Sequence, residues 1–289
     1  MTSDETIGGL LHEGRIALER AAIDDAELEA DVLLRHAMGL GADRAHLIAS
    51  MHDAAPPGLG ERYGELLRRR ASHEPTAYIT GQREFYGLEF ACSPAALIPR
   101  PETELLVELA VAWLAERAIE RPLIIDAGTG SGALAVALAV ACPSARVVAL
   151  DVSGAALRLA RQNAARHGVA VRIDLVRCDL IGPIRGRADL IVANLPYVAE
   201  TDWPALAPEI TEHEPKRALT GGAKGTEIIE RLLREARPAL ADRSLLLCEC
   251  GDTQGERLTA AARRAYPDAR VAIHKDLAGL DRVLQVALG

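Results

Sequence analysis

Hydrophobic positions in the first part of the chain recur at helical spacing. Apolar residues fall three and four apart over residues 10–18 and 30–37, and Gly39 follows the second stretch as a candidate helix C-cap. After a Pro-Pro-Gly break at 56–58, the same spacing predicts a third helix over residues 59–71. We therefore predict a small helical domain over residues 1–73.

The pattern changes over residues 74–98. Residues 77–81 and 84–90 are rich in aromatic and β-branched side chains and are separated by a short turn signal. They predict a β-hairpin that links two domains. Residues 98–104 then lead into a helix, because Pro101 suits the first helical turn and acidic side chains suit the positive helix end.

Strand-like and helix-like patterns alternate through residues 99–289. Short apolar runs predict seven strands, at 123–126, 146–151, 171–176, 189–193, 244–250, 270–274 and 283–287. Helical patterns fill most of the intervals. Such alternation is typical of an α/β domain with a mostly parallel sheet and helices on both faces.

Composition narrows the class of protein. The net charge of -8 argues against a broad non-specific nucleic-acid binder, which needs a basic face. No apolar run is long enough to span a bilayer, and the N-terminus lacks a basic-then-apolar leader, so we expect no membrane contact and a cytoplasmic protein. The five cysteines lack the paired spacing of zinc ligands, so we interpret them as small buried hydrophobes and predict no metal.

A glycine-rich turn follows the predicted strand at 123–126. Glycines let the backbone turn tightly and approach a ligand closely, so we predict a nucleoside-cofactor site there. The turn comprises Gly128, Thr129, Gly130, Ser131 and Gly132. The same glycines satisfy the looser dinucleotide fingerprint, so on this motif alone NAD stays an alternative.

Carboxylates follow the next two strands. Asp151 can accept both ribose hydroxyls, while Asp179 can accept from an exocyclic amino group and Leu180 can pack on a base. An Asp after a strand is also a common helix N-cap, which is the alternative for both aspartates. Asp126, close to the turn, would repel a pyrophosphate but not a sulfonium, and so favours S-adenosylmethionine over NAD.

The tetrapeptide Asn194-Leu195-Pro196-Tyr197 follows the strand at 189–193, at the edge where ligands of α/β sheets bind. Methyl transfer to an amide or amine nitrogen needs groups that accept hydrogen bonds from the N–H groups of that nitrogen. The Asn194 side chain and the Leu195 carbonyl can supply two, because Pro196 biases Leu195 to an extended conformation. Tyr197 can pack against the planar group. A plain strand-to-loop turn is the alternative, since Asn and Pro are common in turns.

These residues resemble the class I S-adenosylmethionine-dependent methyltransferases, and more narrowly the bacterial release-factor glutamine methyltransferases (the PrmC/HemK family). The resemblance covers nearly the whole chain. Besides the glycine turn and residues 194–197, the segments that carry it are 78–86, 97–104, 213–215, 219–222 with Gly225, 276–279 and 281–283. It implies a Rossmann-like class I methyltransferase domain with S-adenosylmethionine as cofactor.

The resemblance also implies a substrate, the glutamine in the Gly-Gly-Gln loop of peptide chain release factors. Residues 194–197 would hold that glutamine, residues 128–132 and Asp151 would hold the cofactor, and Leu180 would line the adenine pocket. The N-terminal helical domain would help to dock the release factor. The family pattern is Asn-Pro-Pro-Tyr, so Leu195 is a departure that removes one fixed φ angle but keeps the backbone carbonyl.

Other functions compete with this one. An exocyclic-amine (adenine) nucleic-acid methyltransferase needs similar geometry, although the net charge counts against it. A non-catalytic module on a methyltransferase scaffold is a second alternative, because fold alone does not imply activity. Three further residues have open roles. Arg100 is a contact for cofactor or substrate, or an ion pair; Glu214 closes the site loop or pairs with Lys216 or Arg217; Glu249 is structural.

Overall fold

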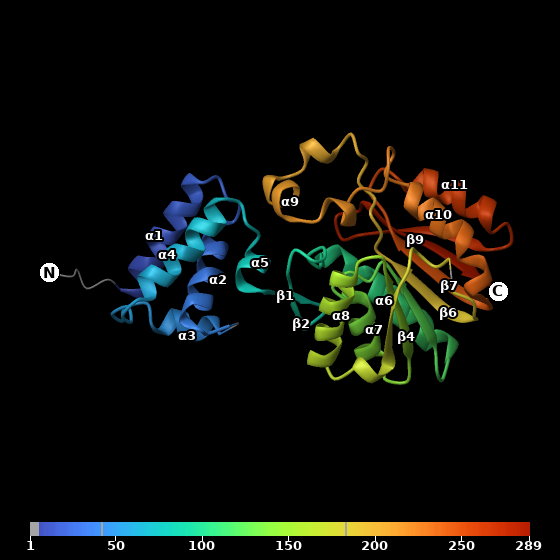
Figure 1. Cartoon of the computed structure of the whole chain (residues 1–289), viewed down its shortest axis with the longest axis horizontal. Helices are drawn as coiled ribbons and strands as arrows, with labels where there is room; N and C mark the ends of the chain where they lie inside the picture. The colour runs from blue at the N-terminus through green and yellow to red at the C-terminus, as the bar shows by residue number, and fades with distance from the viewer. Residues whose placement is uncertain (1–5, 42, 183) are drawn as a thin grey trace. The chain divides into compact units, whose positions relative to one another are not determined.

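The computed structural model describes residues 6–41, 43–182 and 184–289 (Figure 1). Residues 1–5 of the predicted 1–73 domain lie outside the described residues. The chain divides into two compact units. The smaller contains the chain up to Gly81 together with Ala207–His213, and the larger contains Gln82–Leu206 and Glu214–Gly289.

The smaller unit is helical, as predicted. Its N-terminal helices are α1 (Ile7–Arg20), α2 (Ala26–Met38), α3 (Arg44–Ala49), α4 (Leu59–Ala71) and α5 (Thr76–Thr80). The apolar stripes of α1, α2 and α4 meet around Leu18, Leu33 and Tyr63, all fully buried. The Tyr63 hydroxyl donates to the Ala30 carbonyl at 3.1 Å, so the buried phenol keeps a partner.

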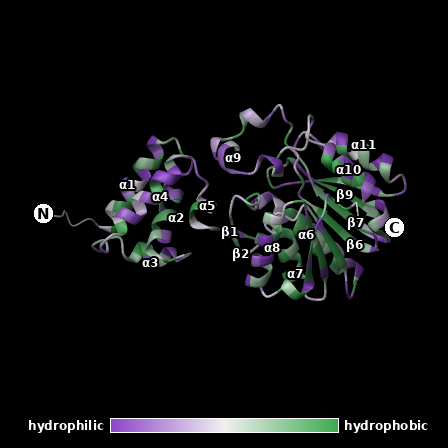
Figure 2. Cartoon of the chain, in the orientation of Figure 1, coloured by the Kyte–Doolittle hydropathy of each residue, from purple (hydrophilic) through white to green (hydrophobic). Residues whose placement is uncertain are grey.

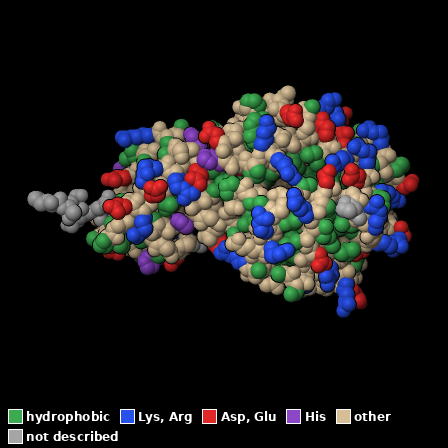
Figure 3. All heavy atoms as spheres, viewed as in Figure 1, with side chains coloured by type: hydrophobic (Ala, Val, Ile, Leu, Met, Phe, Trp, Pro, Cys, Tyr) green, Lys and Arg blue, Asp and Glu red, His purple; other side chains and the backbone are tan. Residues whose placement is uncertain are grey.

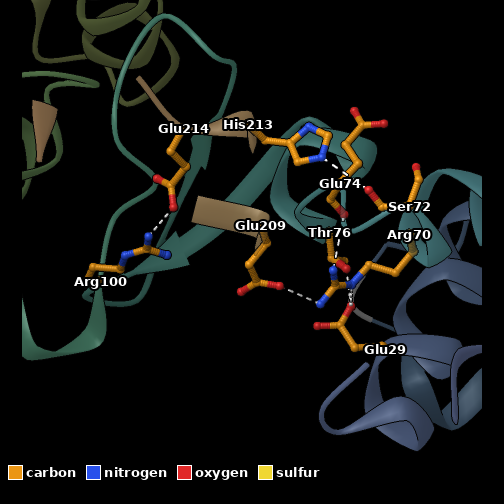
Figure 4. A network of polar contacts seen from close by, with 9 residues as sticks. All are labelled: Glu29, Arg70, Ser72, Glu74, Thr76, Arg100, Glu209, His213 and Glu214. Atoms are coloured by element: carbon orange, nitrogen blue, oxygen red, sulfur yellow. Dashed lines mark hydrogen bonds and ion pairs between the residues drawn. The ribbon is translucent and has the colours of Figure 1, made fainter. Parts of the chain in front are cut away.

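A short helix from far along the sequence completes this unit. α9 (Pro208–His213) belongs to it by its contacts, although it follows the strands of the larger unit in the chain. Buried Arg70 on α4 bonds to Glu209 on α9 at 2.8 Å and to Glu29 on α2 at 3.3 Å (Figure 4). One guanidinium therefore ties α9 to two other helices.

The predicted hairpin is shorter than expected and lies in the larger unit. Residues 77–81 form α5, not a strand, because Pro75 and Gly81 delimit a single helical turn, with Gly81 at φ 75°. The hairpin pairs β1 (Gln82–Phe85) with β2 (Leu88–Ala91). Tyr86 and Gly87 between them both have positive φ, which is the tight-turn geometry that joins two strands. The single strand predicted over 84–90 therefore contains both strands and their turn.

The larger unit is built on a seven-stranded sheet with the order β5-β4-β3-β6-β7-β9-β8. Its strands are β3 (Leu123–Ala127), β4 (Arg146–Asp151), β5 (Ile173–Arg177), β6 (Ala188–Ala193), β7 (Leu240–Glu249), β8 (Arg270–Lys275) and β9 (Asp281–Leu288). Among this sheet's strands, within the described residues, β9 runs antiparallel to the other six. All seven predicted strands are present, and the predicted mostly parallel sheet is confirmed.

Helices cover both faces of this sheet (Figure 1). They are α6 (Glu104–Arg117), α7 (Ala133–Ala141) and α8 (Gly154–Arg166) on one face, and α10 (Glu227–Glu235) and α11 (Gly255–Ala265) on the other. Strand side chains alternate between the faces, so Ile124 packs with the first group and Ile125 with the second. The apolar strands visible in Figure 2 are therefore buried on both sides.

The strand order reverses between β3 and β6. The chain moves from β3 outward to β4 and β5, and then returns to place β6 on the other side of β3. Ligands of open α/β sheets bind outside the carboxyl ends of strands at such a switch point. The glycine turn follows β3 and Asn194 follows β6, so the fold brings the two predicted sites to this point.

The surface of the larger unit carries both signs of charge. On the face seen in Figure 3, basic and acidic side chains are interspersed. In the parts of the chain that the structure describes, no helix has the length and apolar character needed to cross a membrane.

Candidate active site

The glycine turn between β3 and α7 is held against the neighbouring strand. The backbone N–H groups of Gly128 and Thr129 both donate to the Leu150 carbonyl, at 2.9 and 2.8 Å. Gly128 has φ 79°, and a Cβ there would come within 2.8 Å of the Leu195 side chain. Glycine at this position therefore allows both the left-handed backbone and the close approach of the 194–197 segment.

Two side chains near the turn are structural. Asp126 is fully buried and accepts from the Thr129 hydroxyl at 2.6 Å and from the Ala135 N–H at 3.2 Å. Burial raises the pKa of Asp126 to about 7, against the opposing effect of these two donors. The carboxyl of Asp126 and the hydroxyl of Thr129 thus connect the turn to the first residues of α7.

Asp151, at the end of β4, is oriented by two backbone groups. One oxygen accepts from the Gly130 N–H at 2.9 Å and the other accepts from the Ser153 N–H at 2.8 Å. Helix α8 is capped by Ser153, whose hydroxyl accepts from the Ala156 N–H. The capping alternative for Asp151 is therefore wrong. Its oxygens keep free acceptor capacity toward a ligand, since a carboxylate has about four lone-pair sites.

A cavity of about 690 Å³ lies at this end of the sheet. It is lined by eight of the predicted site residues, namely Gly128, Gly130, Asp151, Asp179, Leu180, Asn194, Leu195 and Pro196. Four others do not line it, namely Thr129, Ser131, Gly132 and Tyr197. A volume of this size is typical of cofactor and small-ligand sites. The fold thus gathers residues from four predicted strand ends around one space.

The structure adds cavity-lining residues that sequence reasoning missed. Residues 94–97 line the cavity just before the segment singled out at 98–104, and Ile228 and Arg231 line it from α10. Arg231 forms an ion pair with Asp179, whose side chain is 67% exposed. The available sequence signal was the three-residue spacing of Ile228 and Arg231, which places both on one side of α10.

The side chain of Asn194 forms a hydrogen bond with the segment that precedes α6. Its side-chain NH2 donates to the Thr103 hydroxyl at 2.9 Å. Thr103 in turn donates to the Glu249 carboxylate at 2.6 Å, and the Tyr197 hydroxyl donates to the other Glu249 oxygen at 3.1 Å. Burial raises the pKa of Glu249, while these two hydrogen bonds and Arg282 act to lower it. Tyr197 therefore supports the site from outside the cavity.

The residues after Asn194 pack against a glycine-rich segment. Val198 N–H donates to the Leu219 carbonyl, and Gly221 N–H donates to the Val198 carbonyl, at 2.8 and 2.9 Å. A Cβ on Gly221 would lie 2.3 Å from the Pro196 carbonyl oxygen. Only glycine fits this approach, which explains physically why the segment at 219–222 accompanies the transfer motif.

Arg100 and Glu214 form an ion pair (Figure 4). The Glu214 carboxylate is 1% exposed and also accepts from the Ile98 N–H at 3.1 Å. Of the interpretations left open for Arg100, the structure therefore shows the ion pair. Glu214, the first residue after α9, connects the chain at this point to residues 98–100. Its ion-pair partner is Arg100, not Lys216 or Arg217.

Two family models match the chain. Residues 9–81 match the family model described as PrmC N-terminal domain, and residues 124–213 match the model described as Methyltransferase domain. A release factor glutamine methyltransferase of Nitratidesulfovibrio vulgaris is 38% identical over 98% of this chain and 95% of its own length. Another, from Bordetella pertussis, is 41% identical over 89% of this chain and 93% of its own.

This chain belongs to the release factor glutamine methyltransferase family. The predicted resemblance is thus confirmed. Solved structures at lower identity show the same fold. The catalytic domain of human METTL16, solved with an RNA hairpin, matches 77% of this chain and 82% of its own at TM-score 0.57 and 16% identity. The predicted class I methyltransferase fold is likewise confirmed.

Proposed function

We propose that this protein transfers a methyl group from S-adenosylmethionine to the side-chain amide nitrogen of the glutamine in the Gly-Gly-Gln motif of peptide chain release factors. One observation carries the proposal. In a chain of this family, Asn194 and the glycine turn line a single cavity at the switch point of the sheet. An amide-binding group and a nucleoside-binding turn therefore lie within reach of one another.

The cavity suits the cofactor chemically. Gly128 and Gly130 present backbone without side chains, and Asp151 presents preoriented carboxylate oxygens for ribose hydroxyls. Buried Leu180 gives an apolar surface for a base, and Asp179 lies next to it. We propose these residues as the cofactor site. Thr129, Ser131 and Gly132, which the sequence also placed there, shape the turn from outside the cavity.

S-adenosylmethionine, when bound, supplies an electrophilic methyl group on a sulfonium. The protein has to orient the glutamine nitrogen and exclude water. We propose that the Asn194 side-chain oxygen and the Leu195 carbonyl oxygen accept hydrogen bonds from the two N–H groups of the glutamine amide. The nitrogen lone pair then faces the methyl group. Pro196 restrains Leu195 to the extended backbone that aims its carbonyl.

We infer the partners and the compartment from the same proposal. The partner is a release factor presenting its Gly-Gly-Gln loop, with the helical unit assisting in docking, and neither nucleic acid nor membrane takes part directly. We propose a cytoplasmic enzyme, because its proposed substrate is a peptide chain release factor. Neither the adenine methyltransferase nor the non-catalytic module gains support from an observation in the site.

Labelling of a release factor tests this function. Purified protein is incubated with methyl-labelled S-adenosylmethionine and unmethylated release factor, beside a release factor whose motif is Gly-Gly-Ala. We expect label on the first and none on the second. Label on both would assign the methyl group to another residue, and absence of label with cofactor binding retained would favour the non-catalytic module.

Replacing Leu195, at which this chain departs from the family pattern, tests how the backbone carbonyl of that residue acts as the second acceptor. Leu195→Pro keeps the backbone carbonyl and fixes φ near -65°, so we expect turnover to stay the same or to rise. A Cβ on Gly128 would lie 2.8 Å from Leu195 Cδ2, and a proline ring reaches less far from the backbone than this leucine side chain. Single-turnover rates with the release factor measure the effect. A large loss of turnover with normal folding would show that the leucine side chain itself is required.

A further inference from the structure

The orientation of the Asn194 amide is determined by its neighbours. Thr103 is 4% exposed, and its hydroxyl is the acceptor for the Asn194 NH2 at 2.9 Å. That hydroxyl lies 2.6 Å from a Glu249 oxygen, to which it donates. The three residues come from the start of α6, the end of β6 and the end of β7, so only the folded unit brings them together.

Proton counting gives this chain of hydrogen bonds a direction. A hydroxyl group has one proton, and Thr103 uses it to donate a hydrogen bond to Glu249. The Thr103 oxygen can then only accept, so the group that Asn194 presents to it must be the NH2. The amide oxygen of Asn194 consequently points away from Thr103, within the same amide plane. Since Asn194 lines the cavity, this oxygen is the group available to a substrate.

Glu249 is held so that it accepts and does not donate. It is 1% exposed, and its second oxygen accepts from the Tyr197 hydroxyl at 3.1 Å. Each carboxylate oxygen of Glu249 thus accepts a hydrogen bond from a hydroxyl group. Burial has the largest effect on the pKa of Glu249 and raises it, as does Glu102 beside Thr103, while the two hydroxyl donors and Arg282 at the start of β9 lower it. The hydrogen bonds therefore run in one direction, from the Asn194 amide to the Thr103 hydroxyl and from that hydroxyl to Glu249.

We propose that Thr103 and Glu249 are positioning residues that hold the Asn194 amide with its NH2 toward the protein and its oxygen toward the substrate. This inference rests on the proposed function, since it concerns how a glutamine is recognised. A glutamine NH2 meets an acceptor in this arrangement. A glutamate carboxylate in the same place meets the Asn194 oxygen, which repels it. The residues thus select an amide over an acid of nearly equal size.

Thr103→Val tests the inference because valine keeps the shape of threonine and removes the hydroxyl. Without that acceptor the Asn194 amide is free to turn over and present its NH2 to the cavity. Thr103→Ser restores the hydroxyl. Ser244→Ala is the matched control, since Ser244 is a fully buried hydroxyl on β7 that bonds only to the Ala241 carbonyl among the described residues.

The main measurement is the affinity for release factors with Gly-Gly-Gln or Gly-Gly-Glu motifs, in the presence of S-adenosylhomocysteine, which prevents turnover. We expect the wild-type preference for glutamine to fall about tenfold in Thr103→Val, the equivalent of one hydrogen bond. Thr103→Ser and Ser244→Ala should keep it. Turnover should fall in Thr103→Val alone, with the cofactor Kd unchanged. An unaltered glutamine preference and turnover in Thr103→Val would overturn the proposal.

A measurement without substrate separates this proposal from the proposed function. NMR measures how fast the side-chain NH2 hydrogens of Asn194 exchange with solvent. Their signals are assigned by their loss in Asn194→Asp. The exchange should be slow in wild type and Thr103→Ser and rapid in Thr103→Val. If the wild type fails to label a release factor, the proposed function fails, and slow exchange that depends on Thr103 still supports the amide orientation. Equal exchange in all three proteins contradicts it.

Discussion

Asn194→Ala should lower turnover about 10²- to 10³-fold while leaving the cofactor Kd nearly unchanged. The Asn194 side chain is proposed to accept a hydrogen bond from an N–H group of the glutamine amide when the glutamine nitrogen faces the methyl group. Removal of such a positioned group raises the barrier to transfer. The contacts proposed for the cofactor come instead from Gly128, Gly130, Asp151, Asp179 and Leu180, which the substitution does not touch.

Single-turnover kinetics at saturating cofactor, together with calorimetric titration of the cofactor, would measure the two effects separately. Gln285→Ala is a suitable control, because it removes a side-chain amide from β9 whose hydrogen bond is to His274. We expect that control to retain wild-type turnover. A variant of Asn194 that loses cofactor affinity yet turns over normally at saturation would contradict the orienting role.

Asp151→Ala should weaken cofactor binding about 10²-fold or more. Hydrogen bonds to a charged group contribute about 1.5–3 kcal/mol each, and Asp151 is proposed to accept two from ribose. The variant also removes the acceptor of the Gly130 N–H at 2.9 Å and so releases the glycine turn. Both effects act on the cofactor site, and turnover at saturating cofactor should fall less than the affinity does.

Titration of S-adenosylmethionine or S-adenosylhomocysteine measures this prediction. Asp174→Ala is the matched control, since Asp174 on β5 is 59% exposed and pairs only with Arg146 among the described residues. We expect wild-type affinity there. If Asp151→Ala binds cofactor as tightly as the wild type but melts at a lower temperature, Asp151 only orders the turn and contacts no ribose.

Local errors in the sequence prediction have a common cause. Residues 77–81 have strand-like side chains but form a helical turn, because Pro75 and Gly81 delimit it. Residues 84–90 were predicted as one strand, and the positive φ of Tyr86 and Gly87 divides them into two. Side-chain type was informative at both places, but the backbone conformation of single residues decided the outcome.

The domain division shows a similar limit. The sequence predicted domains 1–73 and 99–289 with a linker between them, whereas the contacts place Ala207–His213 with the N-terminal helices. Six residues of α9 carry too weak a periodic pattern to show which core they join. The ion pair between Glu209 and Arg70 spans 139 positions, and no local pattern predicts it.

Much of this protein is determined by the sequence alone. The seven strands, the glycine turn after β3 and Asn194 after β6 follow from short-range patterns, because strand periodicity and turn residues act locally. Only the tertiary structure decided which side chains act behind those in the cavity. Glu249 lies between two cysteines in the sequence, yet in the fold it meets Thr103, 146 positions away, because the segment before α6 packs against the carboxyl ends of β6 and β7.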